Sequence, residues 1–167
     1  MKWFNVLPTM LLSAVLSLCC ISEVFAKTKK EIKMERVDKV VKFLQDAKVF
    51  YIATTEESQP RVRPFGVVVN IDGKVSICTG SFKNVYKQII KNPKVEISAM
   101  VPDGKWMRLT GVLEDNTSDI NKQRFFDIMP GLKDRYKNNL QDFVVFSFSK
   151  ARVTIENMEG VKETIDI

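Results

Sequence analysis

Short runs of strand-forming residues, separated by tight-turn dipeptides, constrain the fold of this chain more than any other feature. Asp72-Gly73 joins two apolar runs directly, and Asp103-Gly104 separates two more. Such dipeptides favour hairpin turns, so neighbouring runs are expected to pair as antiparallel strands. The expected strands cover residues 49–55, 61–71, 74–79, 95–101, 106–114 and 143–156. Six strands with hairpin connections and helices between them predict a mainly β, α+β fold, either an antiparallel barrel or an open sandwich.

Helical segments are expected between the strands. Apolar residues recur at helical spacing from Ile32 to Ala47, with charged residues between them. A short helix from Lys83 to Lys91 should end at Asn92-Pro93, because a proline restricts the residue before it. Another helix is expected from about Asp119 to Met129, and Pro130-Gly131 should separate it from a second helical piece.

The strand expected over residues 106–114 has two different faces. One face carries Met107, Leu109, Gly111 and Leu113, and the other carries Trp106, Arg108, Thr110 and Val112. Because successive side chains on a strand point to opposite sides, the first face belongs to the core. On the second face, Trp106 and Arg108 suit stacking on an aromatic ligand or packing against a partner subunit.

The first 26 residues have the features of a signal peptide. Lys2 is followed by an uncharged run from Trp3 to Ile21, and Val24-Phe25-Ala26 supplies the small-x-small pattern of a cleavage site. We therefore expect cleavage after Ala26 and one mature domain, residues 27–167, that is periplasmic or secreted without a stable membrane association. An uncleaved membrane anchor is the alternative, because the apolar run approaches the roughly 20 residues that span a bilayer.

The composition excludes several kinds of chemistry. The sequence contains no histidine, which excludes His-dependent triads, His-ligated zinc or haem iron, and a His general base. Cys19 and Cys20 lie in the signal segment, so the mature domain keeps only Cys78 and has no internal disulfide. Cys78 lies in an apolar strand and is interpreted as a small buried hydrophobic residue, not as a nucleophile. We expect no metal site, and the net charge of +6 favours anionic ligands.

The stretch from Thr79 to Ile90 has the composition of an anion-binding helix start. The small residues Thr79-Gly80-Ser81 end a strand, Lys83 follows, and an amphipathic helix begins. The first turn of a helix leaves backbone N–H groups unpaired and carries the positive end of the helix dipole. This turn could therefore hold a phosphate beside a lysine. Alternatively, Ser81 could simply be the N-cap of the helix.

A second segment could reach the same ligand. Arg61 and Arg63 lie two residues apart, so their side chains share one face of a strand and could bind an anion together. Charges on an exposed strand edge explain them as well, and Pro64 fits an edge because it has no N–H to donate. Gly66 allows the backbone to approach a flat ligand closely.

Several sequence blocks in this order resemble a known family. The blocks are Phe43-Leu44, Tyr51-Ile52-Ala53-Thr54, residues 59–66, Ile77-Cys78-Thr79 with residues 83–89, residues 92–96 and residues 104–111. Together with their spacing, they make the chain from Val37 to about Glu114 resemble the pyridoxamine 5′-phosphate oxidase-like family of FMN-binding split barrels. The resemblance implies a six-stranded, Greek-key-like split β-barrel that forms a homodimer with two FMN molecules at its interface.

The resemblance also implies a set of cofactor-binding residues. They are Arg63, Pro64, Phe65, Gly66, Cys78, Thr79, Lys83, Asn84 and Trp106. By this resemblance, the strand from Arg63 to Gly66 would run along the flavin, and Thr79, Lys83 and Asn84 would hold the phosphate. Trp106 would approach the cofactor from the second subunit.

Departures from the family pattern narrow the expected activity. True pyridoxamine phosphate oxidases hold the FMN phosphate with an Arg-Lys pair at the helix entry, where this chain has Asn84 and Val85. They also carry a C-terminal segment that completes the vitamin site, and this chain shows no clear counterpart before Ile167. Pyridoxamine phosphate oxidation is therefore not expected. The nitroimidazole-reductase and haem-degrading branches depend on histidines that this chain lacks.

We therefore expect an exported FMN-binding flavoprotein, an oxidoreductase that reduces a small-molecule acceptor through bound FMN. No catalytic side chain is assigned. The expected partners are a small-molecule substrate and a second copy of the chain, with no nucleic acid. One alternative is a non-catalytic protein that uses the same barrel to bind FMN, haem or another flat ligand. Another is an oligonucleotide-binding module, which basic charge and strand aromatics would suit, although export argues against it.

Overall fold

The computed structural model describes the backbone of residues 7–160 and 162–167, and the side chains from Lys27 onward except residue 161. The expected signal segment therefore lies partly outside the described residues, and cleavage after Ala26 stays a prediction. Among the residues whose side chains are described, from Lys27 onward, no helix combines the length and the apolar character that crossing a bilayer requires.

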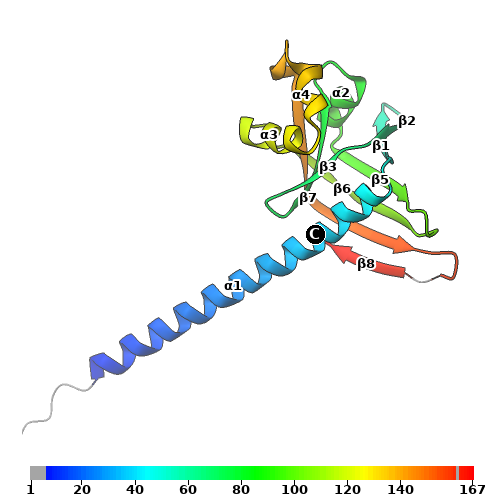
Figure 1. The fold of residues 1–167 in the computed structure, drawn as a ribbon. Helices are drawn as coiled ribbons and strands as arrows, with labels where there is room; N and C mark the ends of the chain where they lie inside the picture. The colour runs from blue at the N-terminus through cyan, green and yellow to red at the C-terminus, as the bar shows by residue number, and fades with distance from the viewer. Residues whose placement is uncertain (1–6, 161) are drawn as a thin grey trace, which may run out of the picture.

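In the described part of the chain, eight strands form one antiparallel sheet (Figure 1). The strands are β1 (Phe50–Glu56), β2 (Gln59–Phe65), β3 (Val68–Ile71), β4 (Lys74–Gly80), β5 (Lys94–Met100), β6 (Trp106–Asp115), β7 (Phe143–Glu156) and β8 (Lys162–Asp166). Their order is β2-β1-β5-β6-β7-β4-β3, and β8 pairs with β7. The predicted mainly β, α+β architecture is confirmed, because an open antiparallel sheet of this kind is consistent with a split barrel.

The strand count is eight instead of the expected six, for two physical reasons. The expected strand over residues 61–71 is divided at Gly66, because β2 pairs with β1 while β3 pairs with β4 at the other edge of the sheet. Strand β8 is largely charged and lacks the apolar alternation that would reveal it. It is held by its ladder with β7 and by ion pairs such as Arg152–Asp166 at 2.8 Å and Lys162–Glu156 at 3.3 Å.

Four α-helices and one 3₁₀ turn accompany the sheet in the described chain. They are α1 (Leu7–Asp46), α2 (Asn84–Lys91), α3 (Asp119–Ile128), α4 (Pro130–Tyr136) and the turn Leu140–Asp142. The C-terminal part of α1 packs on β3 and β4, and its other end extends away from the sheet (Figure 1). The helical spacing of Val37, Val40, Val41 and Leu44 predicted this packing, since all four are buried.

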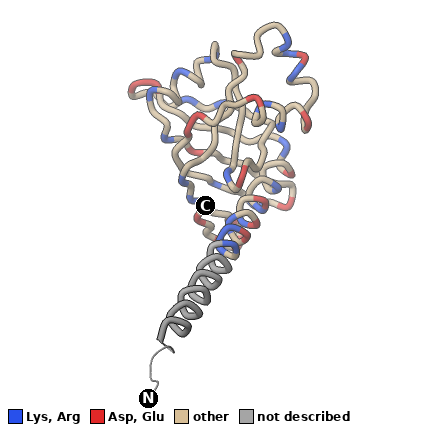
Figure 2. Tube along the Cα trace, turned by 90° about the vertical axis from the view of Figure 1, so that its left-hand side faces the viewer, with Lys and Arg blue, Asp and Glu red and all other residues tan. Residues whose placement is uncertain are grey.

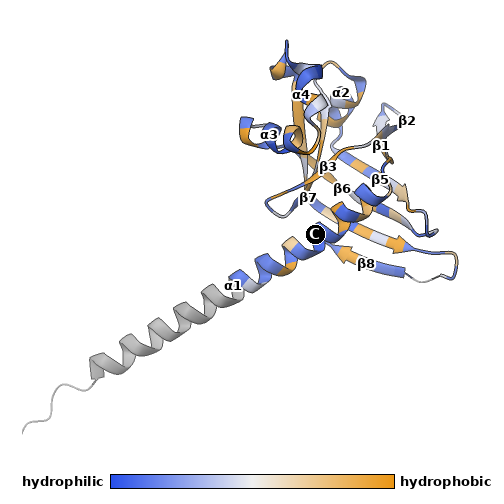
Figure 3. Cartoon of the chain, viewed as in Figure 1, coloured by the Kyte–Doolittle hydropathy of each residue, from blue (hydrophilic) through white to orange (hydrophobic). Residues whose placement is uncertain are grey.

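Two hydrophobic clusters lie on opposite faces of the sheet. The larger one is enclosed by the sheet, α1 and α2, and the smaller one lies under α3 and α4. The first half of β7 contributes side chains to both clusters. Val144 and Phe146 face the larger cluster, and Phe143 and Val145 face the smaller one, because successive side chains on a strand point to opposite sides. The ring centroid of Phe143 lies 4.9 Å from that of Phe126 and 5.1 Å from that of Tyr136. This packing fixes α3 and α4 against the outside of the sheet. Figure 3 shows the apolar residues of β7 beside these two helices.

Strand β6 has the two faces expected from its sequence. Met107, Leu109 and Leu113 are buried, whereas Arg108 and Thr110 are exposed. The ladder between β6 and β7 shifts its register between Val112 and Leu113. This irregularity brings the backbone of β7 close to β6 beside Gly111.

Candidate functional site

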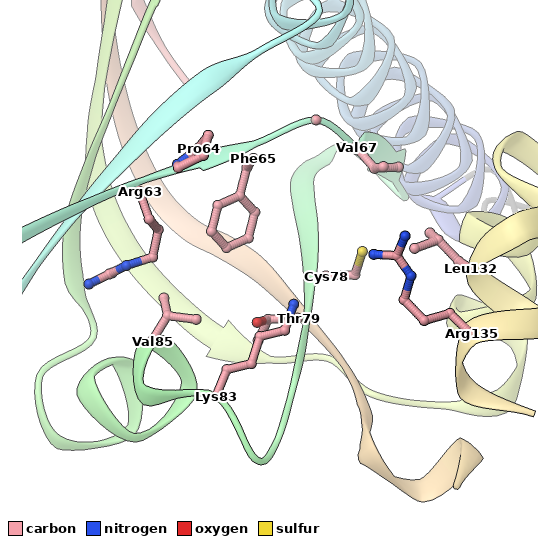
Figure 4. A pocket seen from close by; sticks show the side chains of 11 residues that line it. Arg63, Pro64, Phe65, Val67, Cys78, Thr79, Lys83, Val85, Leu132 and Arg135 are labelled. Carbon is pink, nitrogen blue, oxygen red and sulfur yellow. The ribbon is translucent and has the colours of Figure 1, made fainter. Parts of the chain in front are cut away.

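A pocket forms where β4 loses one of its neighbours. Strand β3 begins at Val68, which pairs with Ile77, so the last three residues of β4 have β7 on one side and no strand on the other. The chain between Phe65 and Val68 curves past this open edge (Figure 4). The end of β2, the end of β4, the start of α2 and one face of α4 enclose a cavity of about 380 Å³. This volume suits a small organic ligand.

The structure brings together seven of the nine predicted cofactor-binding residues. Arg63, Pro64, Phe65, Gly66, Cys78, Thr79 and Lys83 all line the pocket. Asn84 begins α2 but is not among the lining residues. Trp106 begins β6 opposite Met100 and Glu156, outside the lining. Its approach to the cofactor of a second subunit stays a prediction, as does the homodimer itself.

Thr79 supplies a buried polar group that the described protein leaves unpartnered. The residue is only 4% exposed, and its Oγ1 atom has no hydrogen-bond partner among the described residues. A buried hydroxyl without a partner costs about 1–3 kcal/mol. A hydroxyl in a ligand pocket can recover this cost by bonding to the ligand, so Thr79 is a strong candidate for a ligand contact.

The start of α2 is open to a ligand. Lys83 is the N-cap residue, with extended φ and ψ of −81° and 147°, and no side chain caps the helix. Ser81 instead donates from its Oγ to Asp142 Oδ1 at 2.7 Å, so its interpretation as the N-cap is wrong. The first N–H groups of an uncapped helix favour an anion.

The charge of the pocket is entirely positive. Lys83 reaches it from α2 and Arg135 reaches it from α4, and no aspartate or glutamate is among the described lining residues (Figure 4). Neither Lys83 nor Arg135 has an ion pair with another described residue. Elsewhere on the domain, acidic and basic residues are interspersed (Figure 2). Unpaired cations facing one cavity favour an anionic ligand.

The two arginines of β2 do not act as a pair. Arg61 forms a 2.9 Å ion pair with Glu56. The guanidinium of Arg63 points away from the cavity, and donates to Thr54 Oγ1 and to Gln88 Oε1, each at 2.7 Å (Figure 4). Burial, and then the charge of Arg61, lower the pKa of Arg63. Contrary to the expectation from the sequence, Arg61 and Arg63 are therefore not placed to bind one anion together. Arg63 instead links β1, β2 and α2.

Cys78 has the environment of an inert thiol. It is half-buried, and burial raises its pKa to about 12, although the charge of Lys83 acts in the opposite direction. A thiol with this pKa stays protonated near neutral pH and is a poor nucleophile. Cys78 is inert as expected, but it is half-buried and not fully buried, because it lines the pocket.

Four lining residues were missed from the sequence. Val67 and Val85 adjoin predicted residues, and a wider window around each motif would have found them. Leu132 and Arg135 belong to α4, more than 50 positions after the end of β4. Their place depends on how the aromatic residues of α3 and α4 pack on Phe143, which no local pattern reveals.

A family model described as pyridoxamine 5′-phosphate oxidase matches residues 37–157. This chain belongs to the pyridoxamine 5′-phosphate oxidase family. The family is one of flavin-binding split barrels, and the match covers the strands and helices that form the pocket.

Solved structures of other proteins share the fold. A NimC/NimA family protein from Clostridium acetobutylicum is 38% identical, with a TM-score of 0.78 over 83% of this chain and 96% of that chain. A heme binding protein from Mycobacterium smegmatis is 18% identical, with a TM-score of 0.58 over 74% of this chain and 57% of that one. General Stress Protein 26 from Bacillus anthracis is 13% identical, with a TM-score of 0.60 over 78% and 98%. A comparison with curated protein sequences finds no match.

Proposed function

We propose that the pocket binds FMN and that the protein is an oxidoreductase that reduces a small-molecule acceptor. The observation that carries this proposal is the unpartnered Thr79 hydroxyl beside two unpaired cations in a cavity without a described carboxylate. The phosphate of one ligand would satisfy both the Thr79 hydroxyl and the charge of Lys83. Membership of a flavin-binding family supports FMN as that ligand.

The residues present fit FMN at both of its ends. Lys83, the Thr79 hydroxyl and the first N–H groups of α2 would hold the phosphate. The backbone between Phe65 and Val68 and the open edge of β4 would face the flavin ring. Phe65 and Val67 line the pocket with apolar surface, which would exclude water from the ring. Bound FMN would supply the electron transfer.

No side chain in the pocket has the properties of a general acid or base near neutral pH. The chain contains no histidine, and the pKa of Cys78 is raised to about 12. The protein would therefore contribute position and electrostatics, and a histidine-dependent reaction is excluded. The 38% identity with the NimC/NimA family protein supports a shared fold and not a histidine-dependent reaction in this chain.

This lack of an acid or base also favours the second candidate, a non-catalytic flavin-binding protein. The two candidates differ in how bound flavin exchanges electrons. For the oxidoreductase, NADH or NADPH added without oxygen should bleach the visible band of the bound flavin, and an added quinone should restore it. Bound flavin that neither nicotinamide reduces, and that no quinone reoxidises after chemical reduction, would instead identify a binding protein.

Replacing Thr79 with valine should have opposite effects on stability and on binding. Valine keeps the shape but removes the unpartnered hydroxyl, so the protein without flavin should become more stable by about 1 kcal/mol. FMN affinity should fall on the order of tenfold, because one hydrogen bond to the phosphate is lost. Urea unfolding and flavin titration measure the two effects.

Thr54→Val is the matched control for this substitution. Thr54 is as deeply buried as Thr79, but its Oγ1 accepts from Arg63 and donates to Gln88 at 2.7 Å. Its replacement should therefore destabilise the protein. If Thr79→Val destabilised the protein equally and left FMN affinity unchanged, the Thr79 hydroxyl would have a structural role only.

A further inference from the structure

Helix α4 presents an apolar and a cationic side chain on the same face toward the pocket. Leu132 and Arg135 are three residues apart, so they are neighbours on the helix surface, and both line the cavity (Figure 4). The next residue, Tyr136, is buried and packs edge-on against Phe143, with 5.1 Å between the two ring centroids. Arg135 therefore extends from a backbone that is fixed against the smaller hydrophobic cluster.

The guanidinium of Arg135 is free to bind a ligand. No hydrogen bond or ion pair joins its side chain to another described residue, and no described carboxylate lines the cavity. The carboxylate of Asp142 already accepts a hydrogen bond from Ser81. It lies near α4, where burial, and to a smaller extent the charge of this carboxylate, raise the pKa of Tyr136. Arg135 enters from α4, whereas Lys83 and the uncapped helix start enter from α2. The pocket thus has cationic groups on two separate elements.

We propose that Arg135 forms a second anion-binding subsite, which takes the carboxylate of a small organic acceptor whose apolar part contacts Leu132. This inference rests on the proposed function and adds a substrate class to it. The planar guanidinium matches a carboxylate through two parallel hydrogen bonds. An apolar neighbour one turn away favours an organic acid over an inorganic ion. The phosphate of the cofactor is left to Lys83, Thr79 and the start of α2.

Benzoate is a suitable probe because it joins a flat apolar ring to one carboxylate. Its binding to the FMN-loaded and to the FMN-free protein is measured by calorimetry, with benzamide as the uncharged probe of the same shape. Three variants are compared with the wild type: Arg135→Gln, Arg135→Lys and Lys133→Gln. Lys133 lies on the same helix outside the lining, so its replacement removes an equal charge without touching the cavity.

Arg135→Gln should weaken benzoate binding on the order of tenfold, because a charge-assisted bidentate contact is lost. Arg135→Lys should recover only part of this affinity, and Lys133→Gln should leave it unchanged. Benzamide binding and FMN affinity should be the same in all four proteins. This pattern would establish the subsite independently of turnover.

Other results overturn the proposal. If Arg135→Gln weakened FMN but not riboflavin, Arg135 would hold the cofactor phosphate. Equal losses of benzoate affinity in Arg135→Gln and Lys133→Gln would indicate diffuse charge attraction, and no benzoate binding to the wild type would exclude the subsite. Failure of the proposed cofactor can be distinguished from failure of the subsite. Absence of FMN binding to the wild type would rule out the cofactor, whereas benzoate binding to the FMN-free protein tests the subsite alone.

Discussion

Replacing Lys83 with alanine is expected to lower the affinity for FMN on the order of tenfold to a hundredfold. Lys83 lines the pocket at the uncapped start of α2, beside the unpartnered Thr79 hydroxyl. By the family resemblance, Asn84 and Val85 stand where the oxidases carry their Arg-Lys pair. The charge of Lys83 should then carry more of the phosphate affinity here. Riboflavin lacks the phosphate and should bind the wild type and the variant equally.

Lys87→Ala is the matched control for this prediction. Lys87 is exposed on α2, one turn beyond Lys83, and does not line the pocket. Its replacement removes the same charge from the same helix and should leave both flavin affinities unchanged. Titration of FMN and riboflavin against the three proteins gives the comparison. If riboflavin lost as much affinity as FMN in Lys83→Ala, Lys83 would support the pocket wall and not the phosphate.

Replacing Gly111 with alanine is expected to reduce the free energy of unfolding by roughly 2–3 kcal/mol, through overpacking. A Cβ atom at Gly111 would lie 2.5 Å from the Lys150 backbone oxygen, 2.7 Å from Phe148 Cδ1 and 3.0 Å from Ala151 Cβ. The Lys150 oxygen cannot rotate away as a side chain would, because β7 is held by ladders to β6 and β8. The β6–β7 ladder would have to shift locally.

Gly131→Ala is the control for Gly111→Ala, because it adds the same methyl group where there is space for it. Gly131 lies in α4, and a Cβ atom there would meet nothing within 4 Å. Alanine should therefore leave stability unchanged or raise it by up to about 1 kcal/mol, because it favours the helix. Denaturant unfolding of the two variants measures the difference. Equal stability of Gly111→Ala and the wild type would contradict the close approach of β7 to β6.

The sequence predicted the fold well where local pattern and long-range packing agree. The Asp72-Gly73 turn predicts the β3–β4 hairpin, and the spacing from Val37 to Leu44 predicts the buried face of α1. The division at Gly66 was not predicted, because it arises from the exchange of one partner strand for another at opposite edges of the sheet. Strand β8 was missed since its stability comes from its ladder and its ion pairs with β7.

The parts of the pocket that come from short continuous segments could be predicted from the sequence. The segments from Arg63 to Gly66 and from Cys78 to Lys83 each bring neighbouring residues to the same wall. The rotation of Arg63 toward Thr54 and Gln88 could not be predicted, because its partners come from β1 and α2. Arg135 was missed for a similar reason, since its position depends on the packing of Tyr136 against Phe143.

Titration of the wild-type protein into FMN, followed by flavin fluorescence, tests most directly whether the pocket is a flavin site. We predict saturable quenching that ends at one FMN per chain, with weaker binding of riboflavin because Lys83, Thr79 and the start of α2 then have no phosphate to hold. Unchanged flavin emission in the presence of excess protein would contradict the assignment of the pocket to FMN.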